Sequence, residues 1–456
     1  MIKLIRDDML KSVLMLIGVI LTIHSIILCH EAGHYLAARI FKIKVKTFTV
    51  GLGKTIWQYI DKNDVTWRFG IFPLGGYVVL LNTQLDKVSL SELKQSFNIK
   101  PLWQKIVVYL AGPLVNILLA IIIYSGLFLN GMYEVKPNIA RVINGSIAYK
   151  ANVTAPSLIT SINDNKVSSW RETSIALIDS LGKDSKIKLT TNIDNYELNT
   201  SKWGIHTLNF NPIENIGFKA YTPPTPAVVT EIVRGSPAEG QLKIGDKILF
   251  INNTKIKDFS DYEEALKHLA NKEINLTIST NNSTKIIPIK TSWTFKDGWN
   301  IVGYLGIKPK LTKWPEDKIN LRKYDLIGAI GAAFDATLSM LHFNFIVLGK
   351  ILTRVIPLAS LSGPIGFIGV AFASLNNGIT VFLEVVAIFN ILIAFANLLP
   401  MPGLDGGNII FRIIEAVKGR AINYLWQELI TTFSIIFLVV LTVHATINDL
   451  LRLFTN

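Results

Sequence analysis

The chain carries long apolar stretches toward both ends and a polar stretch in its middle. Four of the apolar stretches reach the length of about 20 residues that a helix needs to cross a bilayer. Each of them therefore predicts a transmembrane helix. These stretches lie approximately at residues 13–41, 106–129, 379–399 and 425–447.

A further apolar stretch, residues 326–373, is interrupted by Lys350, Arg354, Pro357 and the turn Ser362-Gly363-Pro364. Charged and helix-breaking residues are unfavourable at the centre of a bilayer. We therefore expect two helices here that are amphipathic or lie on the membrane surface.

Between the first two spans, residues 45–60 and 65–81 are rich in β-branched and aromatic residues and alternate as strands do. Turn residues stand at 61–64 and 73–76. Strands this apolar, flanked by membrane helices, predict a membrane-associated β-sheet. Its backbone must satisfy its own hydrogen bonds or pair with another chain.

Such a sheet could bind a substrate by adding a strand to its edge. Gly51 and Gly53 would allow a second backbone to approach closely, so both are candidate substrate-binding residues. The alternative is a purely structural hairpin in which these glycines only make turns.

The polar middle contains an internal repeat. PNIARVINGSIAYKA…LITSINDNKV is followed about ninety residues later by PAVVTEIVRGSPAEGQLKIGDKILFINNTKI. Each copy has an apolar strand, a Gly-Ser turn, a patch of small residues and a second strand. The repeat predicts two small domains of one type.

Composition supports a membrane body with a soluble insert. Of the 456 residues, 50% are hydrophobic and 17% charged, and the mean hydropathy is +0.39; soluble proteins typically have about a quarter charged residues. The net charge of +13 comes from scattered Lys and Arg without a basic run, which argues against nucleic acid and for anionic lipid headgroups as the partner. The first stretch lacks a small-residue cleavage site, so we interpret it as a retained helix rather than a signal peptide.

The candidate chemistry lies in the first span, in the run His30-Glu31-Ala32-Gly33-His34. Histidines spaced i, i+4 project from one face of a helix, so both imidazoles can bind one Zn²⁺. Glu31 lies close enough to take a proton from a metal-activated water without binding the metal. The alternative, two helix histidines that only make hydrogen bonds, is weakened by the cost of ionisable groups in a membrane.

A zinc enzyme needs a third protein ligand. Cys29 is the only cysteine, so the remaining ligand should be a His or a carboxylate. Asp405 is the best candidate, because the prolines and glycines around it in NLLPMPGLDGG break the helix and free the backbone to aim the carboxylate. The alternative is a solvated Asp in an interfacial loop.

HEAGH in the first span, AGPLVN (111–116) in the second and NLLPMPGLDGG (397–407) at the third together resemble the site-2 protease family of intramembrane metalloproteases. The order of elements is similar to the bacterial RseP type, in which two PDZ-like domains are inserted between spans two and three. The resemblance covers essentially the whole chain. Asn408 stands where the family often has His, at a position that is not a ligand.

The resemblance implies one Zn²⁺ per chain, held by His30, His34 and Asp405, with Glu31 as the catalytic base. It also implies that Asn397 helps to hold the unwound substrate or its reacting carbonyl, although an Asn in a span can equally cap a helix or bond a neighbour. It further implies a polytopic α-helical membrane protein of about four transmembrane helices, with a membrane-associated β-sheet and an inserted tandem pair of PDZ-like α+β domains.

The expected organisation has seven parts. They are the first transmembrane helix with HEAGH (1–41), the β-sheet and a cytoplasmic loop (42–103), the second transmembrane helix (104–131), the first PDZ-like domain (132–222), the second PDZ-like domain (223–312), amphipathic or membrane-surface helices (313–375), and the third and fourth transmembrane helices with the LDG motif (376–456).

The resemblance implies cleavage of single-span membrane proteins, such as an anti-sigma factor or remnant signal peptides, in regulated intramembrane proteolysis. It also implies PDZ-like domains that exclude substrates with bulky external parts, so that another protease trims the substrate first. The runs 303–307 and 216–218 could be carboxylate-binding loops, but a plain spacer or a partner-binding module remains open.

The positive-inside rule predicts the orientation. Residues 39–105 are rich in Lys and Arg, and Arg412, Lys418 and Arg420 lie between spans three and four. We expect both segments on the cytoplasmic side of a bacterial inner membrane, with the active site toward that side and the PDZ-like domains in the periplasm. The N-terminal tail carries a weaker, contrary charge signal.

Two other classes of protein share some of these sequence features. A transporter would also have broken spans with polar residues at mid-depth, but it would have more spans and no need of HExxH. A non-catalytic scaffold would tolerate the loss of Glu31, which is present here.

Overall fold

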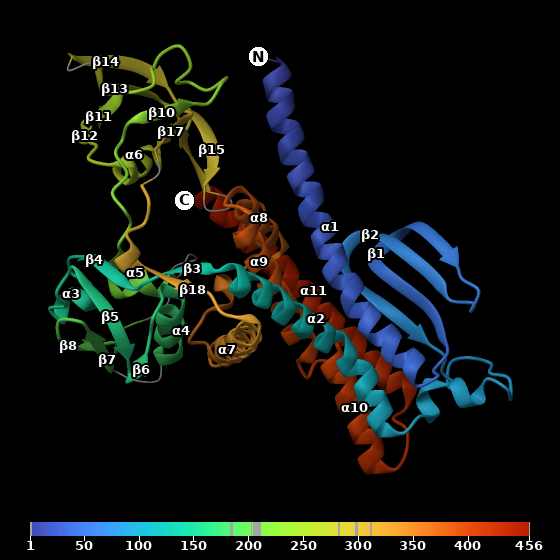
Figure 1. The fold of residues 1–456 in the computed structure, drawn as a ribbon. Coiled ribbons are helices and arrows are strands. Elements are labelled where there is room, and N and C mark those ends of the chain that lie inside the picture. The colour runs from blue at the N-terminus through green and yellow to red at the C-terminus, as the bar shows by residue number, and fades with distance from the viewer. Residues whose placement is uncertain are drawn as a thin grey trace.

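The computed structural model describes residues 2–182, 186–201, 203, 211–280, 283–296, 300–310 and 312–455. The four predicted membrane helices are all confirmed as helices (Figure 1). The first begins at Ile2, earlier than predicted. They are α1 (Ile2–Ile40), α2 (Leu102–Asn130), α9 (Ile379–Leu398) and α11 (Tyr424–Thr455).

The stretch at 326–373 is also helical, as predicted. It contains α7 (Leu326–Leu352), a short 3-10 turn η4 (Leu358–Ser360) and α8 (Pro364–Asn376). By length and composition, six helical segments of the described chain could cross a membrane, because α7 and the segment Leu358–Leu375 join the four expected ones. That these two segments are amphipathic or lie on the membrane surface stays a prediction.

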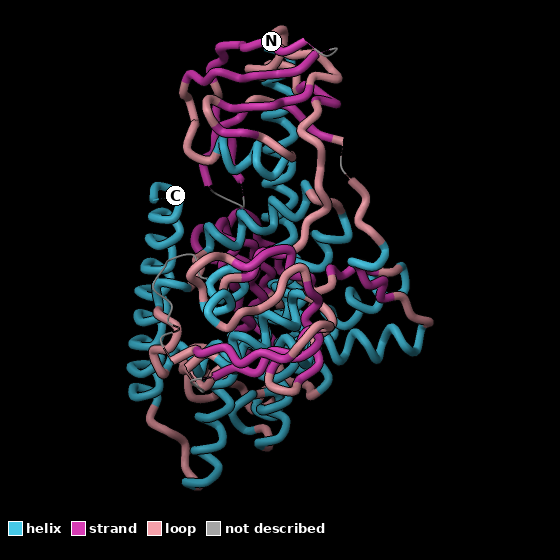
Figure 2. Tube along the Cα trace, turned by 90° about the vertical axis from the view of Figure 1, so that its left-hand side faces the viewer, coloured by secondary structure: helices cyan, strands magenta, loops and turns pink. Residues whose placement is uncertain are grey.

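Helix α2 lies at the centre of the membrane body, packed against α1, α7, α9 and α10 (Asp405–Lys418). Alanines with no exposed surface, including Ala120, Ala333 and Ala387, line the shared core of α2, α7 and α9. Small residues let membrane helices approach closely. Figure 2 shows α11 along one flank of the body, and only 6% of its apolar window is buried.

The predicted strands are β1 (Val45–Ile60) and β2 (Thr66–Leu80). Their pairing makes four segments out of two strands. Residues 45–50 pair with 76–80 in opposite directions. Residues 47–50 also pair, on their other side, with 66–69, and these two segments run in the same direction. Residues 55–60 then pair with 66–70, so the segment order is 76–80, 45–50, 66–70, 55–60.

One face of this sheet packs against α1. The rings of Tyr35 and Trp67 have centroids 5.4 Å apart, and those of Phe48 and Trp67 are 4.6 Å apart. Phe48 is 1% exposed. The sheet is thus tied by aromatic contacts to the helix that carries HEAGH. Two short turns, η1 (Leu93–Gln95) and η2 (Phe97–Ile99), then lead to α2.

A two-stranded ribbon joins the membrane body to the polar middle of the chain. Strand β3 (Met132–Val135) follows α2 directly, and β18 (Ile319–Arg322) precedes α7, and the two pair antiparallel. The short turn η3 (Glu316–Lys318) leads into β18. Everything between residues 136 and 318 is therefore carried by this ribbon.

The polar middle forms two units that share a series of three strands, a helix, two strands and a last strand; two short helices are added in the first unit and two strands in the second. The first contains β4 (Asn138–Val142), α3 (Ile147–Lys150), β5 (Ser157–Ile162), β6 (Asn165–Lys166), α4 (Trp170–Ser180), β7 (Lys186–Thr191), β8 (Asn195–Asn199), α5 (Pro212–Ile216) and β9 (Phe218–Ala220). The second contains β10 (Val229–Ile232), β11 (Lys247–Ile251), β12 (Thr254–Lys255), α6 (Phe259–Leu266), β13 (Glu273–Thr280), β14 (Ser283–Lys290), β15 (Ser292–Lys296), β16 (Asn300–Tyr304) and β17 (Ile307–Pro309).

Each unit has its own apolar core. The units also share a detail at the loops predicted to bind carboxylates. Gly217 and Gly306 both have positive φ, and a Cβ on either would collide with a serine, Ser146 in the first unit and Ser236 in the second. The equivalence supports one domain type, although the predicted first domain includes residues 204–210, outside the described part of the chain.

Figure 1 shows how the parts lie along the helices. The N-terminus of α1 and the second unit lie toward one end of the membrane body, at the top of the view. Helix α10 and the loop between β2 and α2 lie toward the other end.

Candidate metal centre

His30 and His34 lie on the face of α1 that packs against α2. Their exposed fractions are 5% and 8%. A Cβ on Gly33 would collide with the backbone of Ala111 and lie 3.0 Å from the Cα of Gly112. The glycines of HEAGH and AGPLVN thus let the two helices approach closely, and Gly112 itself lies against both imidazoles.

Asp405 comes to the same place from the other end of the chain. It is the first residue of α10, after the break that ends α9. Gly406 and Gly407 have no room for a Cβ, because one would collide with the carbonyls of Leu398 and Leu399 or with Met401. The double glycine therefore allows α10 to start tightly against the end of α9, with the Asp405 carboxylate turned toward α1.

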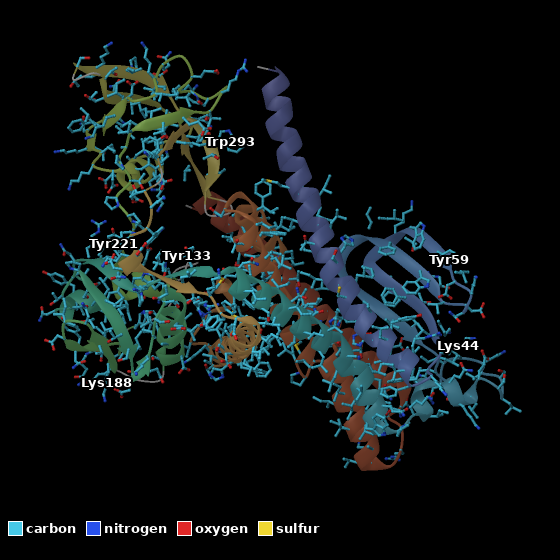
Figure 3. The ribbon with its side chains drawn as sticks, in the orientation of Figure 1. Lys44, Tyr59, Tyr133, Lys188, Tyr221 and Trp293 are labelled. Carbon is cyan, nitrogen blue, oxygen red and sulfur yellow. The ribbon has the colours of Figure 1, made fainter. Side chains whose placement is uncertain are left out.

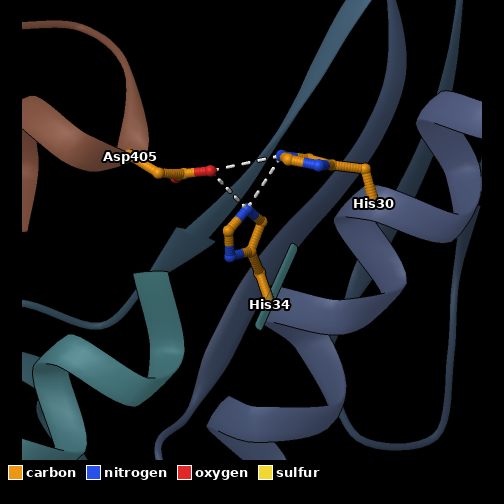
Figure 4. Close-up of side chains that lie close together, drawn as sticks. All are labelled: His30, His34 and Asp405. Carbon is orange, nitrogen blue, oxygen red and sulfur yellow. Dashed lines mark hydrogen bonds and ion pairs between the residues drawn. The ribbon is translucent and has the colours of Figure 1, made fainter. Parts of the chain in front are cut away.

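The three side chains converge in the structure (Figure 4). The Oδ2 of Asp405 lies 3.2 Å from Nε2 of His30 and 3.3 Å from Nε2 of His34. The two Nε2 atoms are 3.3 Å apart. These atoms are the group of described residues that could hold a metal ion.

The three separations match the spacing of zinc ligands. Ligand atoms bound to a tetrahedral zinc at 2.0–2.2 Å lie about 3.3–3.6 Å from one another. Asp405 Oδ2 makes no hydrogen bond of normal geometry with the described residues despite being buried. Two nitrogens and one carboxylate oxygen are also a donor set that zinc prefers. The residues present therefore fit the metal.

One ligand is oriented by the backbone. His34 Nδ1 lies 2.7 Å from the carbonyl oxygen of Val108 in α2. If Nδ1 donates to that carbonyl, Nε2 is left as the atom that faces the centre, an arrangement common for metal-binding histidines. His30 Nδ1 is buried and has no such partner among the described residues.

Glu31 is 5% exposed and lies beside the sheet. A Cβ on Gly76 would be 2.7 Å from Glu31 Cγ, 3.0 Å from its Oε1 and 2.6 Å from the carbonyl oxygen of Thr49. The edge segment 76–80 thus passes directly against the predicted base. Sequence reasoning assigned Gly76 only to a turn; the signal that could have found it is a Gly-Gly pair inside an otherwise apolar strand.

The remaining predicted site residues lie elsewhere in the same region. Asn397 donates from Nδ2 to the carbonyl oxygen of Ile393, 3.0 Å away, one turn back in α9. Gly51 and Gly53 have φ of +81° and +84° and lie where β1 passes from segment 45–50 to segment 55–60. The geometry thus includes the bends that the structural alternative requires, and their part in substrate binding stays a prediction.

The family model "Peptidase family M50" matches residues 18–441. This match extends over the sheet, both units of the polar middle and all three converging side chains.

The chain belongs to peptidase family M50.

Similar proteins are also named as proteases. The "Regulator of sigma E protease" of Haemophilus influenzae is 32% identical, over 95% of this chain and 98% of the relative. A "Putative zinc metalloprotease" of Vibrio cholerae is 28% identical, over 96% and 98%. The "Regulator of sigma-E protease RseP" of Escherichia coli is 26% identical, over 97% and 98%. The prediction of a zinc metalloprotease of the site-2 protease type is confirmed.

The relatives and the apolar helices together indicate a bacterial inner-membrane protein that performs intramembrane proteolysis. A solved PDZ domain of an SdrC-like protein from Listeria monocytogenes is 17% identical over 20% of this chain and 92% of that chain, with a TM-score of 0.17. That score is too low to assign the two units to the PDZ fold, so the PDZ-like pair stays a prediction.

Proposed function

We propose that the chain is a zinc-dependent intramembrane endopeptidase that cleaves the transmembrane segments of single-span proteins. The observation that carries the proposal is the convergence of His30, His34 and Asp405 among apolar helices, at distances that suit one Zn²⁺ per chain. In this proposal the three residues are the metal ligands and Glu31 is the general base.

A bound zinc would polarise a peptide carbonyl and acidify a water molecule. The protein would supply the proton transfer and the exclusion of water. Glu31 Oε1 faces the edge segment, where it can accept the proton of the attacking water and return it to the leaving nitrogen. The low exposure of Glu31, His30 and His34 excludes bulk water, which strengthens these electrostatic interactions.

The substrate has to be unwound, because a helix hides its peptide bonds in its own hydrogen bonds. Segment 76–80 pairs with 45–50 on one side, and no strand pairs with its other side within the described register. A substrate strand added there would run past Gly76 and bring its backbone next to Glu31. We therefore propose this edge as the substrate-binding edge.

Asn397, Gly51 and Gly53 complete the proposed substrate contacts. Asn397 is half-buried in the last turn of α9, and Asp405 follows within a few residues, so its amide could hold the extended substrate or its carbonyl after giving up the bond to Ile393. Gly51 and Gly53, at the bend of β1, would leave room for the substrate backbone.

The domain boundaries given above, the four-span topology and the orientation are part of the proposal. The loop between β2 and α2, which carries Lys87, Lys94 and Lys100, lies toward the same end of the helices as α10, which carries Arg412 and Lys418 (Figure 1). This supports one cytoplasmic face. The active site would lie toward that face and the tandem units in the periplasm.

Substrate choice follows from this arrangement. The tandem units, carried on the β3–β18 ribbon, would exclude proteins with bulky external domains, so that substrates are first trimmed by another protease. Two relatives are named regulators of sigma E. A membrane-bound anti-sigma factor and remnant signal peptides are the substrates we propose, with the lipid bilayer as the other partner and no nucleic acid.

The proposal is tested by reconstituting the full chain in lipid vesicles with a single-span model substrate that carries a short external tail. We expect cleavage within the transmembrane segment, loss of cleavage with a zinc chelator and recovery on adding zinc. Cleavage only outside the segment, or cleavage that persists at undiminished rate after the bound metal has been removed, would reject the proposed function.

The role of the sheet edge predicts the effect of Gly76→Ala. The new Cβ would collide with Glu31 and Thr49, and a misplacement of about 1 Å costs about 100-fold in rate. We expect kcat to fall by about that factor while bound zinc stays at one per chain. Gly126→Ala in α2, where a Cβ meets nothing within 4 Å, is the matched control; equal activity of the two variants would remove Gly76 from the site.

A further inference from the structure

Four charged side chains meet where the first unit approaches the membrane helices. They come from the ribbon (Glu134 and Arg322), from α4 of the first unit (Arg171) and from α9 (Glu384). We call these four residues the charge cluster. They are far apart in the sequence, and the metal centre uses none of them.

The Glu134 carboxylate is the centre of the cluster. Its side chain is 9% exposed, and its Oε1 accepts from Arg171 Nη2 at 2.8 Å and from Arg322 Nη1 at 3.3 Å. Arg171 Nη1 lies 4.0 Å from Glu384 Oε1. Two positive and two negative charges therefore balance across three parts of the fold.

Helices α2 and α9 of the membrane body both contribute to the cluster. The guanidinium of Arg322 lies 4.9 Å from the ring centroid of Phe128 near the end of α2, a cation–π arrangement. Glu384 lies in the second turn of α9. The buried carboxylate of Glu134 is favourable only while it is paired, so loss of an arginine partner leaves its charge less well compensated.

Further contacts hold the first unit in the same position. Asn320 of the ribbon donates to the carbonyl oxygen of Ser168 at 2.9 Å. At the far end of α7, the buried Lys350 donates to the carbonyl oxygen of Leu181, and Ile356 lies within the apolar core of the unit. In Figure 3, Lys188 lies on the outer side of this unit, and Tyr133 marks the ribbon beside the membrane helices.

We propose that the charge cluster determines substrate-size selectivity by clamping the first unit against the membrane body. The clamped unit is then a fixed wall beside the external ends of α2 and α9, and a substrate with a folded external domain cannot pass it. This inference rests on the proposed function, because it assigns residues to the size exclusion that we propose for the tandem units.

The test uses the full chain in vesicles and two single-span substrates that differ only in their external part, a short tail or a folded domain. We compare Arg171→Gln with Lys186→Gln, which also removes one positive charge from the first unit but comes from an exposed ion pair with Glu197 (side chains 59% and 57% exposed). Glu134→Gln is a second variant of the cluster.

For Arg171→Gln and Glu134→Gln, we expect the cleavage ratio of the bulky to the short substrate to rise by at least about tenfold, the factor that corresponds to 1.4 kcal/mol. Cleavage of the short substrate should stay at the wild-type rate, which also shows that the variants fold. Lys186→Gln should keep the wild-type ratio. An unchanged ratio in both cluster variants would overturn the proposal.

A cross-link provides the rescue. Ser168→Cys and Asn320→Cys, joined by a short bis-thiol reagent in the Arg171→Gln chain, should restore the wild-type ratio, while the single-cysteine chains should not respond. A raised ratio that the cross-link leaves unchanged would show that the cluster acts by another route. If the wild-type chain cleaves both substrates equally, the size filter and this proposal both fall, whereas Glu31-dependent cleavage of the short substrate would leave the protease function standing.

Discussion

Replacing Glu31 with Gln is expected to lower kcat by about 1000-fold without reducing bound zinc. The amide keeps the size of the carboxylate but cannot accept the proton of the attacking water, and a positioned general base typically contributes about 100- to 10,000-fold. The two histidines beside it are unaltered, and its carboxylate lies against the strand edge rather than between the ligands. The measurement is single-turnover cleavage of the short-tailed substrate, together with metal analysis of the purified chain.

Glu197→Gln, on the exposed surface of the first unit, is the matched control and should cleave at the wild-type rate. Undiminished cleavage by Glu31→Gln would show that Glu31 is not the base and would refute the catalytic assignment. Membrane peptides that accumulate in cells carrying Glu31→Gln, and not in cells carrying the control, would identify the physiological substrates.

Replacing Asp405 with Asn is expected to weaken zinc binding by more than about 100-fold and to abolish cleavage. Loss of an outer partner of a zinc ligand already costs about 10- to 100-fold in metal affinity, and Asp405 Oδ2 lies within 3.3 Å of both imidazole nitrogens. The neutral amide also removes the negative charge that offsets the metal. Zinc content after dialysis against a graded chelator series measures the change, and His34→Ala should behave in the same way.

Asp335→Asn tests whether the loss of a carboxylate alone is responsible, because Asp335 is exposed on α7 and should leave zinc content unaltered. If Asp405→Asn retains zinc as the wild type does, Asp405 is not a ligand. The centre would then need another third donor, although His30, His34 and Asp405 are the group that the described chain brings together.

Much of the fold was predictable from the sequence because an apolar stretch of about 20 residues is long enough to predict a membrane helix. Four apolar stretches predicted α1, α2, α9 and α11, and the β-branched segments predicted β1 and β2. The beginning of α1 was not predictable, because the helix continues to Ile2 beyond the apolar part of the stretch. Helical backbone hydrogen bonds form in polar segments as well, so hydropathy predicts the apolar span and not the end of the helix.

The pairing of the sheet was also beyond the sequence. Alternation predicts a strand, but it does not reveal that residues 47–50 pair with both 66–69 and 76–79. Which segments pair depends on how the whole sheet packs against α1. Only packing shows that Gly76 lies directly against Glu31.

By itself, the sequence determined the class of this protein, a zinc metalloprotease, and the residues proposed for its metal. The spacing of His30 and His34 places two imidazoles on one helix face, and the helix break around Asp405 makes that carboxylate available, since both are local consequences of backbone geometry. Only the tertiary structure decided how the site is assembled. The approach of α2 through Gly33 and Gly112, the edge segment at Gly76 and the charge cluster join residues tens to hundreds of positions apart, and such contacts depend on how whole elements pack rather than on any local pattern.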